Sequence, residues 1–130
     1  MTGGDNSAVT IWETASGSIH TRLTGITNQH KAWIWCVRFD STGSHMFTCS
    51  SDRSMKIWQR KGPVTWSVLK TIGGHSHRVC MASIEPGRGS KMVTSALDRY
   101  KFCHYVINAI DEICISYLVF ISTVYIVISI

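Results

Sequence analysis

The chain has 130 residues, about the length of one domain, and its 13 Lys and Arg residues outnumber its 8 Asp and Glu residues. This length excludes a large multidomain enzyme, and 45% apolar with 16% charged residues excludes a disordered or collagen-like chain. The composition nevertheless changes along the chain. Of the last 25 residues 18 are apolar, whereas the first 105 carry all 13 basic groups. The sequence therefore divides into a basic globular part and an apolar tail.

Targeting, disulfide and metal signals are weak. The first residues contain neither a basic leader nor an apolar core, so we expect no secretory signal and a reducing environment. Five cysteines without a CxxC pair do not predict a disulfide framework. His75, His77 and Cys80 lack a second ligand pair at a standard spacing, so we predict no metal site and no cofactor. The basic residues are scattered, which favours a solvated surface over a nucleic-acid partner.

Three segments share one pattern at a spacing of 46 residues. Residues 6–12 (NSAVTIW) align with residues 52–58 (DRSMKIW), and residues 98–104 (DRYKFCH) follow at the same interval. His30 and His75, which precede the second and third copies, lie 45 residues apart. A fixed period of this length indicates a repeat architecture.

Within each period the sequence predicts short strands. In chain order, residues 32–39, 45–50, 55–59 and 66–71 are rich in β-branched and aromatic side chains and are separated by turn sequences such as DSTG and SDRS. The residues before 106 show almost no helical pattern. Four strands in about 45 residues predict an all-β fold of antiparallel four-stranded blades, as in a β-propeller.

On these residues the sequence resembles the WD-repeat β-propellers. The resemblance rests on His30, Ser50, Asp52 and Trp58, with 22 residues from His to Asp, Ser two before the Asp and Trp six after it. It implies that these side chains form a structural hydrogen-bond tetrad in which the Asp caps the turn between the second and third strands. The Ser hydroxyl and the Trp donor complete the chain. Such a tetrad pairs turn amides that would otherwise be buried without partners.

The flanking repeats are partial copies. In the third, His75 and Asp98 are present, but Ala96 and His104 replace the Ser and the Trp, which predicts an incomplete hydrogen-bond chain. In the first, Trp12 is present, but the sequence starts in the turn before a third strand, so we expect the first two strands to be absent. These features predict about two and a half blades of an incomplete propeller, a piece of a longer protein with low stability on its own.

We expect a boundary between this partial propeller, residues 1–105, and an apolar tail, residues 106–130. Within the tail, the run 113–130 is 18 uncharged residues, which is long enough to span a membrane. Its richness in Ile, Val and Thr suits strands better than a helix. Two interpretations stay open, a tail anchor in a membrane and read-through sequence without a selected role, and the abrupt loss of the repeat pattern favours the second.

A Ser-His-Asp catalytic triad is the enzymatic alternative for His30, Ser50 and Asp52. Ser50 lies in no G-x-S-x-G elbow, and no oxyanion-hole loop is evident in the sequence. We therefore predict no catalytic residue and a protein that is not an enzyme.

The family resemblance implies a scaffold that binds other proteins in the cytoplasm, and also in the nucleus. The connector 59–79 further resembles the late blades of the WD-repeat subunit of the cytosolic iron–sulfur protein assembly (CIA) targeting complex. That resemblance implies a role in delivering clusters to apoproteins without binding the cluster. Alternatives are an adaptor of another complex, such as a ubiquitin ligase or an RNA-processing scaffold, and a tail-anchored membrane protein.

Overall fold

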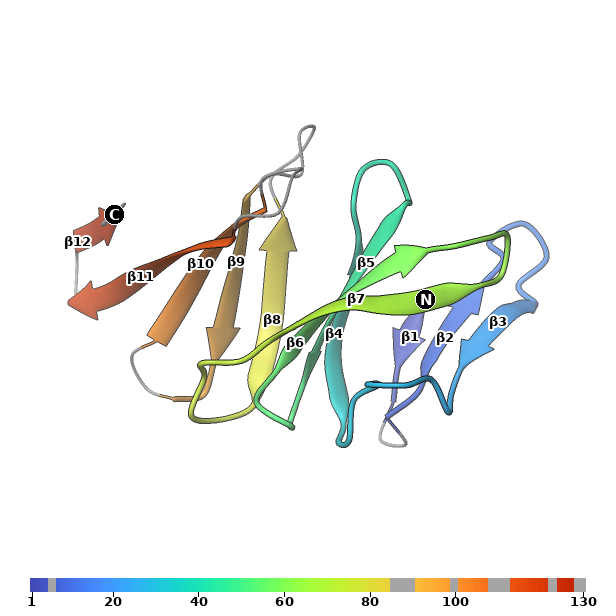
Figure 1. Ribbon diagram of the computed structural model, residues 1–130, viewed down its shortest axis with the longest axis horizontal. Helices are drawn as coiled ribbons and strands as arrows, with labels where there is room; N and C mark the ends of the chain where they lie inside the picture. The colour runs from blue at the N-terminus through green and yellow to red at the C-terminus, as the bar shows by residue number, and fades with distance from the viewer. Residues whose placement is uncertain (5–6, 85–90, 99–100, 108–112, 122–123, 128–130) are drawn as a thin grey trace.

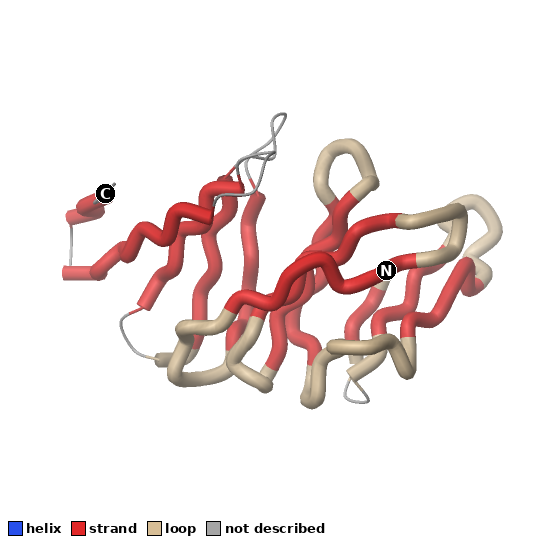
Figure 2. Tube along the Cα trace, in the orientation of Figure 1, coloured by secondary structure: helices blue, strands red, loops and turns tan. Residues whose placement is uncertain are grey.

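The structure is a computed structural model in which the described residues form strands joined by turns and loops (Figure 2). Within this described part of the chain, no helix is long and apolar enough to cross a membrane. The backbone is described for residues 1–4, 7–84, 91–98, 101–107, 113–121 and 124–127, and side chains for residues 1–4, 7–84 and 92–98.

Three sheets follow one another along the chain and stand side by side, with the four-stranded sheet in the middle (Figure 1). In each sheet, neighbours in sequence pair antiparallel, so that every sheet is a meander. The fold is therefore all-β and built of antiparallel blades, as the sequence predicts.

The first sheet holds β1 (Thr2–Gly3), β2 (Val9–Trp12) and β3 (Ile19–Leu23). The second holds β4 (Ile34–Phe39), β5 (His45–Ser50), β6 (Met55–Arg60) and β7 (Trp66–Ile72). The third holds β8 (Val79–Ile84), β9 (Lys91–Ala96), β10 (Lys101–Ile107), β11 (Ile113–Ile121) and β12 (Val124–Val127).

The two inner strands of the middle sheet, β5 and β6, are buried on both faces, and their successive side chains point to opposite sides. In β5, Met46 packs in a cluster shared with the first sheet, whereas Phe47 packs in one shared with the third. In β6, Ile57 and Trp58 divide between the same two clusters. Burying a side chain of this size stabilises the fold by roughly 1.5–3 kcal/mol, so the two clusters hold the three sheets together.

The start of the repeat region differs from the expectation, and at its end the third sheet includes strands of the apolar run. The first sheet contains a strand before Val9, because the short β1 pairs with β2 through Thr2 and Gly3, and two residues are too few to show a strand pattern. At the other end, β10 runs across the boundary expected at residue 105. Part of the apolar run forms β11 and β12, which extend the third sheet to five strands. The remaining tail residues, 108–112, 122–123 and 128–130, lie outside the described residues.

Candidate functional site

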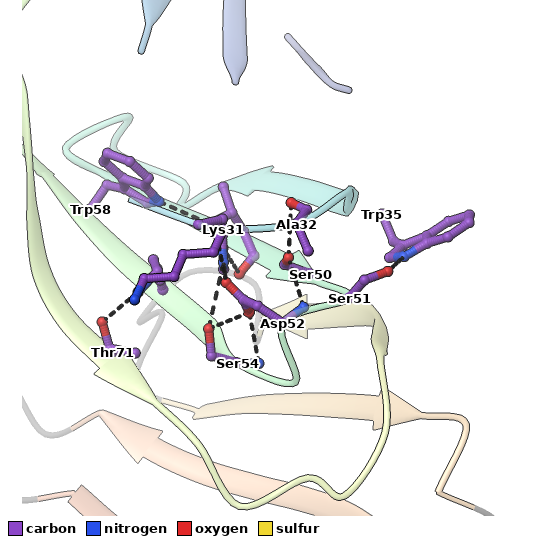
Figure 3. A network of polar contacts seen from close by, with 12 residues as sticks. Lys31, Ala32, Trp35, Ser50, Ser51, Asp52, Ser54, Trp58 and Thr71 are labelled. Carbon is purple, nitrogen blue, oxygen red and sulfur yellow. Dashed lines mark hydrogen bonds and ion pairs between the residues drawn. The ribbon is translucent and has the colours of Figure 1, made fainter. Parts of the chain in front are cut away.

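A buried polar network lies at one end of the middle sheet, where the loop before β4 meets the turn between β5 and β6 (Figure 3). His30 comes from the loop and is 1% exposed, and its Nδ1 lies 2.7 Å from Oδ2 of Asp52 in the turn. The other carboxylate oxygen of Asp52 accepts hydrogen bonds from the amide and the hydroxyl of Ser54, at 3.0 and 2.6 Å. Asp52 therefore closes the turn in which Arg53 adopts a φ of 67°, a left-handed conformation unfavourable for a residue with a Cβ.

Thr48 in β5 connects this pair to the indole of β6. The Nε1–H of Trp58 donates to Oγ1 of Thr48 over 2.9 Å, and the same oxygen lies 2.7 Å from Nε2 of His30. The Thr48 hydroxyl accepts from Trp58 and can donate to Nε2 of His30, and Nδ1–H of His30 can then donate to Asp52. In this arrangement every donor of the chain has one acceptor. The chain from Trp58 through Thr48 and His30 to Asp52 thus satisfies its buried donors.

The hydroxyl of Ser50 has a different position from the one that the family resemblance implies. It donates to the carbonyl of Ala32 over 3.1 Å and accepts the amide of Asp52 over 3.1 Å. The structure thus connects His30, Asp52 and Trp58 through Thr48. Ser50 instead stabilises the turn by hydrogen bonds to two backbone groups. The reason is the position of each residue along β5. Residues 48 and 50 lie on one face, but Thr48 is two residues further from the turn, where it reaches His30 and, diagonally across the pair of strands, Trp58.

The third sheet repeats the arrangement. Nδ1 of His75 lies 2.8 Å from Oδ2 of Asp98, and Nε2 of His75 lies 3.0 Å from Oγ1 of Thr94. Thr94 stands four residues before Asp98, as Thr48 stands four before Asp52. The Ala96 difference therefore leaves this His–Thr–Asp connection in place, because the connecting hydroxyl is that of Thr94. The side chain of His104 lies outside the described residues.

The first sheet contains a shorter version of the same contact. Nε1–H of Trp12 donates to Oγ1 of Thr2 over 3.1 Å, at a site where the indole is 40% exposed. Thr2, Thr48 and Thr94 are spaced by 46 residues, the period of the repeat. This threonine series is the signal in the sequence that identifies the linking hydroxyl.

The charge balance of the network depends on Asp52. Burial raises the pKa of this carboxyl group, but hydrogen bonds from His30 and Ser54 outweigh burial and hold the pKa well below its ordinary value. On β6, Lys56 is 6% exposed and its Nζ donates to Oγ1 of Thr71 over 2.9 Å. Desolvation lowers the pKa of Lys56, while the nearby Asp52 charge favours its protonated form. The network is a set of satisfied structural contacts.

A second group of side chains lies at the start of β4 and in the loop before β8, with Trp33 just before the strand, Trp35 on it and the half-buried Arg78 in the loop. The rings of Trp33 and Trp35 lie 5.8 Å apart, and the two residues are 55% and 43% exposed. The guanidinium of Arg78 lies 4.8 Å from the ring centroid of Trp35, and its Nε is buried without a hydrogen-bond partner. Nε1–H of Trp35 donates to Oγ of Ser51 over 2.6 Å. We call Trp33, Trp35 and Arg78 the tryptophan surface.

Beside this surface, the first strands of the three sheets line an open groove of about 340 Å³. Strand β4 lies between β1 and β8 and contacts both, so residues from all three sheets contribute to it. Among the described residues, no group of three His, Cys, Asp or Glu side chains could hold a metal ion. The groove is lined by Met1, Thr2, Gly3, Ile34, Trp35, Cys36, Val37, Arg38, Cys80 and Met81.

Antiparallel meanders in series, of which the second and third contain His–Thr–Asp networks, are the arrangement of blades in a β-propeller. Residues 21–59, which contain the complete network of the middle sheet, match the family described as "WD domain, G-beta repeat". This match, together with the relatives, supports assignment of the chain to the WD-repeat β-propeller family.

The chain is similar to parts of several longer proteins. Nucleoporin SEH1-B of Xenopus laevis is 38% identical over 77 residues, which is 57% of this chain and 21% of the relative. Pre-mRNA-processing factor 19 homolog 2 of Arabidopsis thaliana is 26% identical over 108 residues, 83% of this chain and 19% of the relative. COMPASS component SWD3 of Saccharomyces cerevisiae is 29% identical over 97 residues, 75% of this chain and 28% of the relative. The chain therefore spans less than a third of the length of each.

Proposed function

We propose that this chain is a non-enzymatic scaffold that binds a partner protein through the tryptophan surface. The observation that carries the proposal is the pair of exposed indoles, Trp33 and Trp35, beside the incompletely paired Arg78. Trp and Arg are the residue types most enriched at the energetic centres of protein interfaces. Trp35 lies on β4, and Trp33 and Arg78 directly precede β4 and β8, so the sheets position all three residues and little conformational freedom is lost on binding.

The chemistry of the surface indicates the kind of partner. Trp33 and Trp35 offer apolar area, and the half-buried Arg78 places its guanidinium 4.8 Å from the ring centroid of Trp35. Arg38, which is exposed, adds a second guanidinium at the groove. A segment with an apolar side chain and a carboxylate would fill both requirements, because a guanidinium binds a carboxylate through strong charge-assisted hydrogen bonds.

The position of Ser50 supports a binding role over hydrolysis. The residue has no exposed surface, and both of its hydroxyl contacts described above involve backbone groups. A catalytic serine needs a base beside its hydroxyl and access for the substrate. We therefore expect a fluorophosphonate probe to leave Ser50 unlabelled in the folded chain, and labelling there would contradict the proposal.

The particular complex is a finer question. The iron–sulfur assembly role rests on the connector 59–79 and stays a prediction. The reported relatives carry names of a nucleoporin, a COMPASS component and a pre-mRNA-processing factor, which support an adaptor role in complexes of the nucleus as well as the cytoplasm. The proposed scaffold role is compatible with an adaptor function in any of these settings.

Affinity purification of the tagged full chain from cells, followed by quantitative mass spectrometry, tests both levels. We expect Trp33→Ala combined with Trp35→Ala to lower partner recovery at least tenfold. Leu69→Ala is a matched control, because Leu69 is 55% exposed, like Trp33, but lies on β7. Equal partner recovery with the double variant and the control would contradict the proposal that the tryptophan surface binds the partner. The identity of the proteins recovered with the unchanged chain would distinguish the iron–sulfur targeting complex from another complex.

A further inference from the structure

Three cysteines meet where the middle and third sheets pack together. Cys36 lies on β4, Cys49 on β5 and Cys80 on β8, and all three are free thiols. Cys36 and Cys80 line the groove, so both are open to small molecules, whereas Cys49 is fully buried. Neither the hydrogen-bond networks nor the proposed docking surface uses these thiols.

Cys36 and Cys49 have the geometry of a disulfide pair. They are directly opposite one another in the antiparallel register of β4 and β5. Opposed residues of such a pair have Cα atoms about 4.5 or 5.5 Å apart and point to the same face of the sheet. A disulfide requires Cα atoms about 4.4–6.8 Å apart, so the bond could close without a change of register.

The surroundings make the two thiols chemically unequal. The contact with the Cys49 thiol, together with the backbone of Ala82 and the charge of Arg38, outweighs burial and lowers the pKa of Cys36 to about 6. The same contact, together with burial, raises the pKa of Cys49 far above its ordinary value, and Cys80 adds to this effect. Cys36 is therefore the nucleophile at neutral pH, and Cys49 is a protonated thiol behind it.

We propose that Cys36 is a redox modification site, at which a hydroperoxide oxidises the sulfur and Cys49 then forms a disulfide with it. In the first step the Cys36 thiolate attacks a peroxide oxygen, the O–O bond breaks, and Cys36 becomes a sulfenic acid while hydroxide or alkoxide leaves. In the second step the Cys49 sulfur attacks Cys36, the S–O bond breaks, and the thiol proton leaves with the hydroxyl as water. Two thiols lose two electrons in total, and one peroxide gains them.

Peptide mapping of the full chain tests the proposal. The reduced protein is treated with hydrogen peroxide, alkylated with iodoacetamide and digested with trypsin. Cleavage after Lys31, Arg38 and Arg53 places Cys36 and Cys49 in separate peptides, and Cys80 falls in a third. We expect peptide 32–38 to be linked to peptide 39–53. Linkage of peptide 32–38 to the Cys80 peptide, or recovery of Cys36 and Cys49 unlinked while Cys80 is oxidised, would overturn the proposal.

Variants separate the two steps. With Cys49→Ser, we expect the sulfenic acid on Cys36 to accumulate and to be trapped by dimedone, and with Cys36→Ser we expect neither adduct nor disulfide. Cys80→Ser is the matched control and should leave the Cys36–Cys49 disulfide unchanged. Because Cys49 is buried and its substitution could prevent folding, dimedone is also added to the unchanged chain during peroxide treatment. An adduct on peptide 32–38 supports the proposal, and an adduct only on another cysteine contradicts it.

Discussion

Two indoles of the middle blade make the same contact in different surroundings. Trp58 donates its Nε1–H to Thr48 over 2.9 Å and is 1% exposed, whereas Trp35 donates to Ser51 over 2.6 Å and is 43% exposed. In the first case the bond satisfies a donor that would otherwise be buried unpaired, so the indole stabilises the blade. In the second case water could replace the hydroxyl, so the indole is available to a partner. Burial, rather than the bond itself, separates the two roles.

The largest expected loss of stability comes from removing the buried indole of this pair, Trp58. We expect Trp58→Ala to lower the free energy of unfolding by about 3–5 kcal/mol, because it leaves a cavity in the cluster shared with the first sheet and removes the donor to Thr48. Trp12→Ala is the control, since Trp12 makes the equivalent contact at 40% exposure. Urea unfolding followed by circular dichroism measures both. Equal losses would show that burial does not separate the two environments.

The next effect concerns the hydroxyl that connects the network. We expect Thr48→Val to lower the free energy of unfolding by about 1–3 kcal/mol, because Trp58 and His30 both lose a buried partner. In a double-mutant cycle with Trp58→Phe, Thr48→Val should be strongly non-additive, since the two changes remove one bond. Ser50→Ala with Trp58→Phe should be nearly additive. Strong non-additivity between Ser50→Ala and Trp58→Phe would instead identify Ser50 as the hydroxyl that connects Trp58 to His30.

A pH titration of stability sharpens the role of Asp52. Its folded-state pKa lies below the unfolded value of about 3.9, so its contribution is complete above that pH and is lost as the pH falls further. We therefore expect acid to destabilise the unchanged chain more than Asp52→Asn below about pH 4. Urea midpoints between pH 7 and pH 2.5 provide the measurement. Parallel pH curves for the two proteins would contradict the assignment.

The smallest expected effect lies on the exposed side. Trp33→Ala should change the free energy of unfolding by less than about 0.5 kcal/mol, because the residue is 55% exposed. The same variant should nevertheless lower partner recovery, which separates binding from stability. Thermal unfolding beside the affinity purification provides the two values. A large loss of stability would place Trp33 among the structural residues.

Much of the fold could be predicted from residue patterns. The 46-residue spacing of 6–12, 52–58 and 98–104 predicted repeated blades, and the four strands of the middle blade fall close to the expected segments. Burial of β5 and β6 on both faces helps to explain this success, because a strand with two buried faces shows its β-branched and aromatic composition directly. The short β1 was missed because two residues, Thr2 and Gly3, carry too little pattern.

The site was predictable only in part. Sequence spacing selected His30, Asp52 and Trp58, but it selected Ser50 for the hydroxyl, where the structure places Thr48. Both residues precede Asp52 at even spacing, so alternation alone puts them on the same face of β5. Register relative to the loop that carries His30 decides between them, and register is a tertiary property.

The sequence by itself determined the repeat period, the all-β class and the His–Asp pairs of the second and third repeats, because these depend on local spacing and side-chain type. Only the tertiary structure decided which tryptophans are buried, where Arg78 meets Trp35, and that Cys36 faces Cys49. These three outcomes depend on strand pairing and on the packing of one sheet against the next. Contacts between residues far apart in the chain follow from the register of the paired strands, which the composition of either segment leaves open.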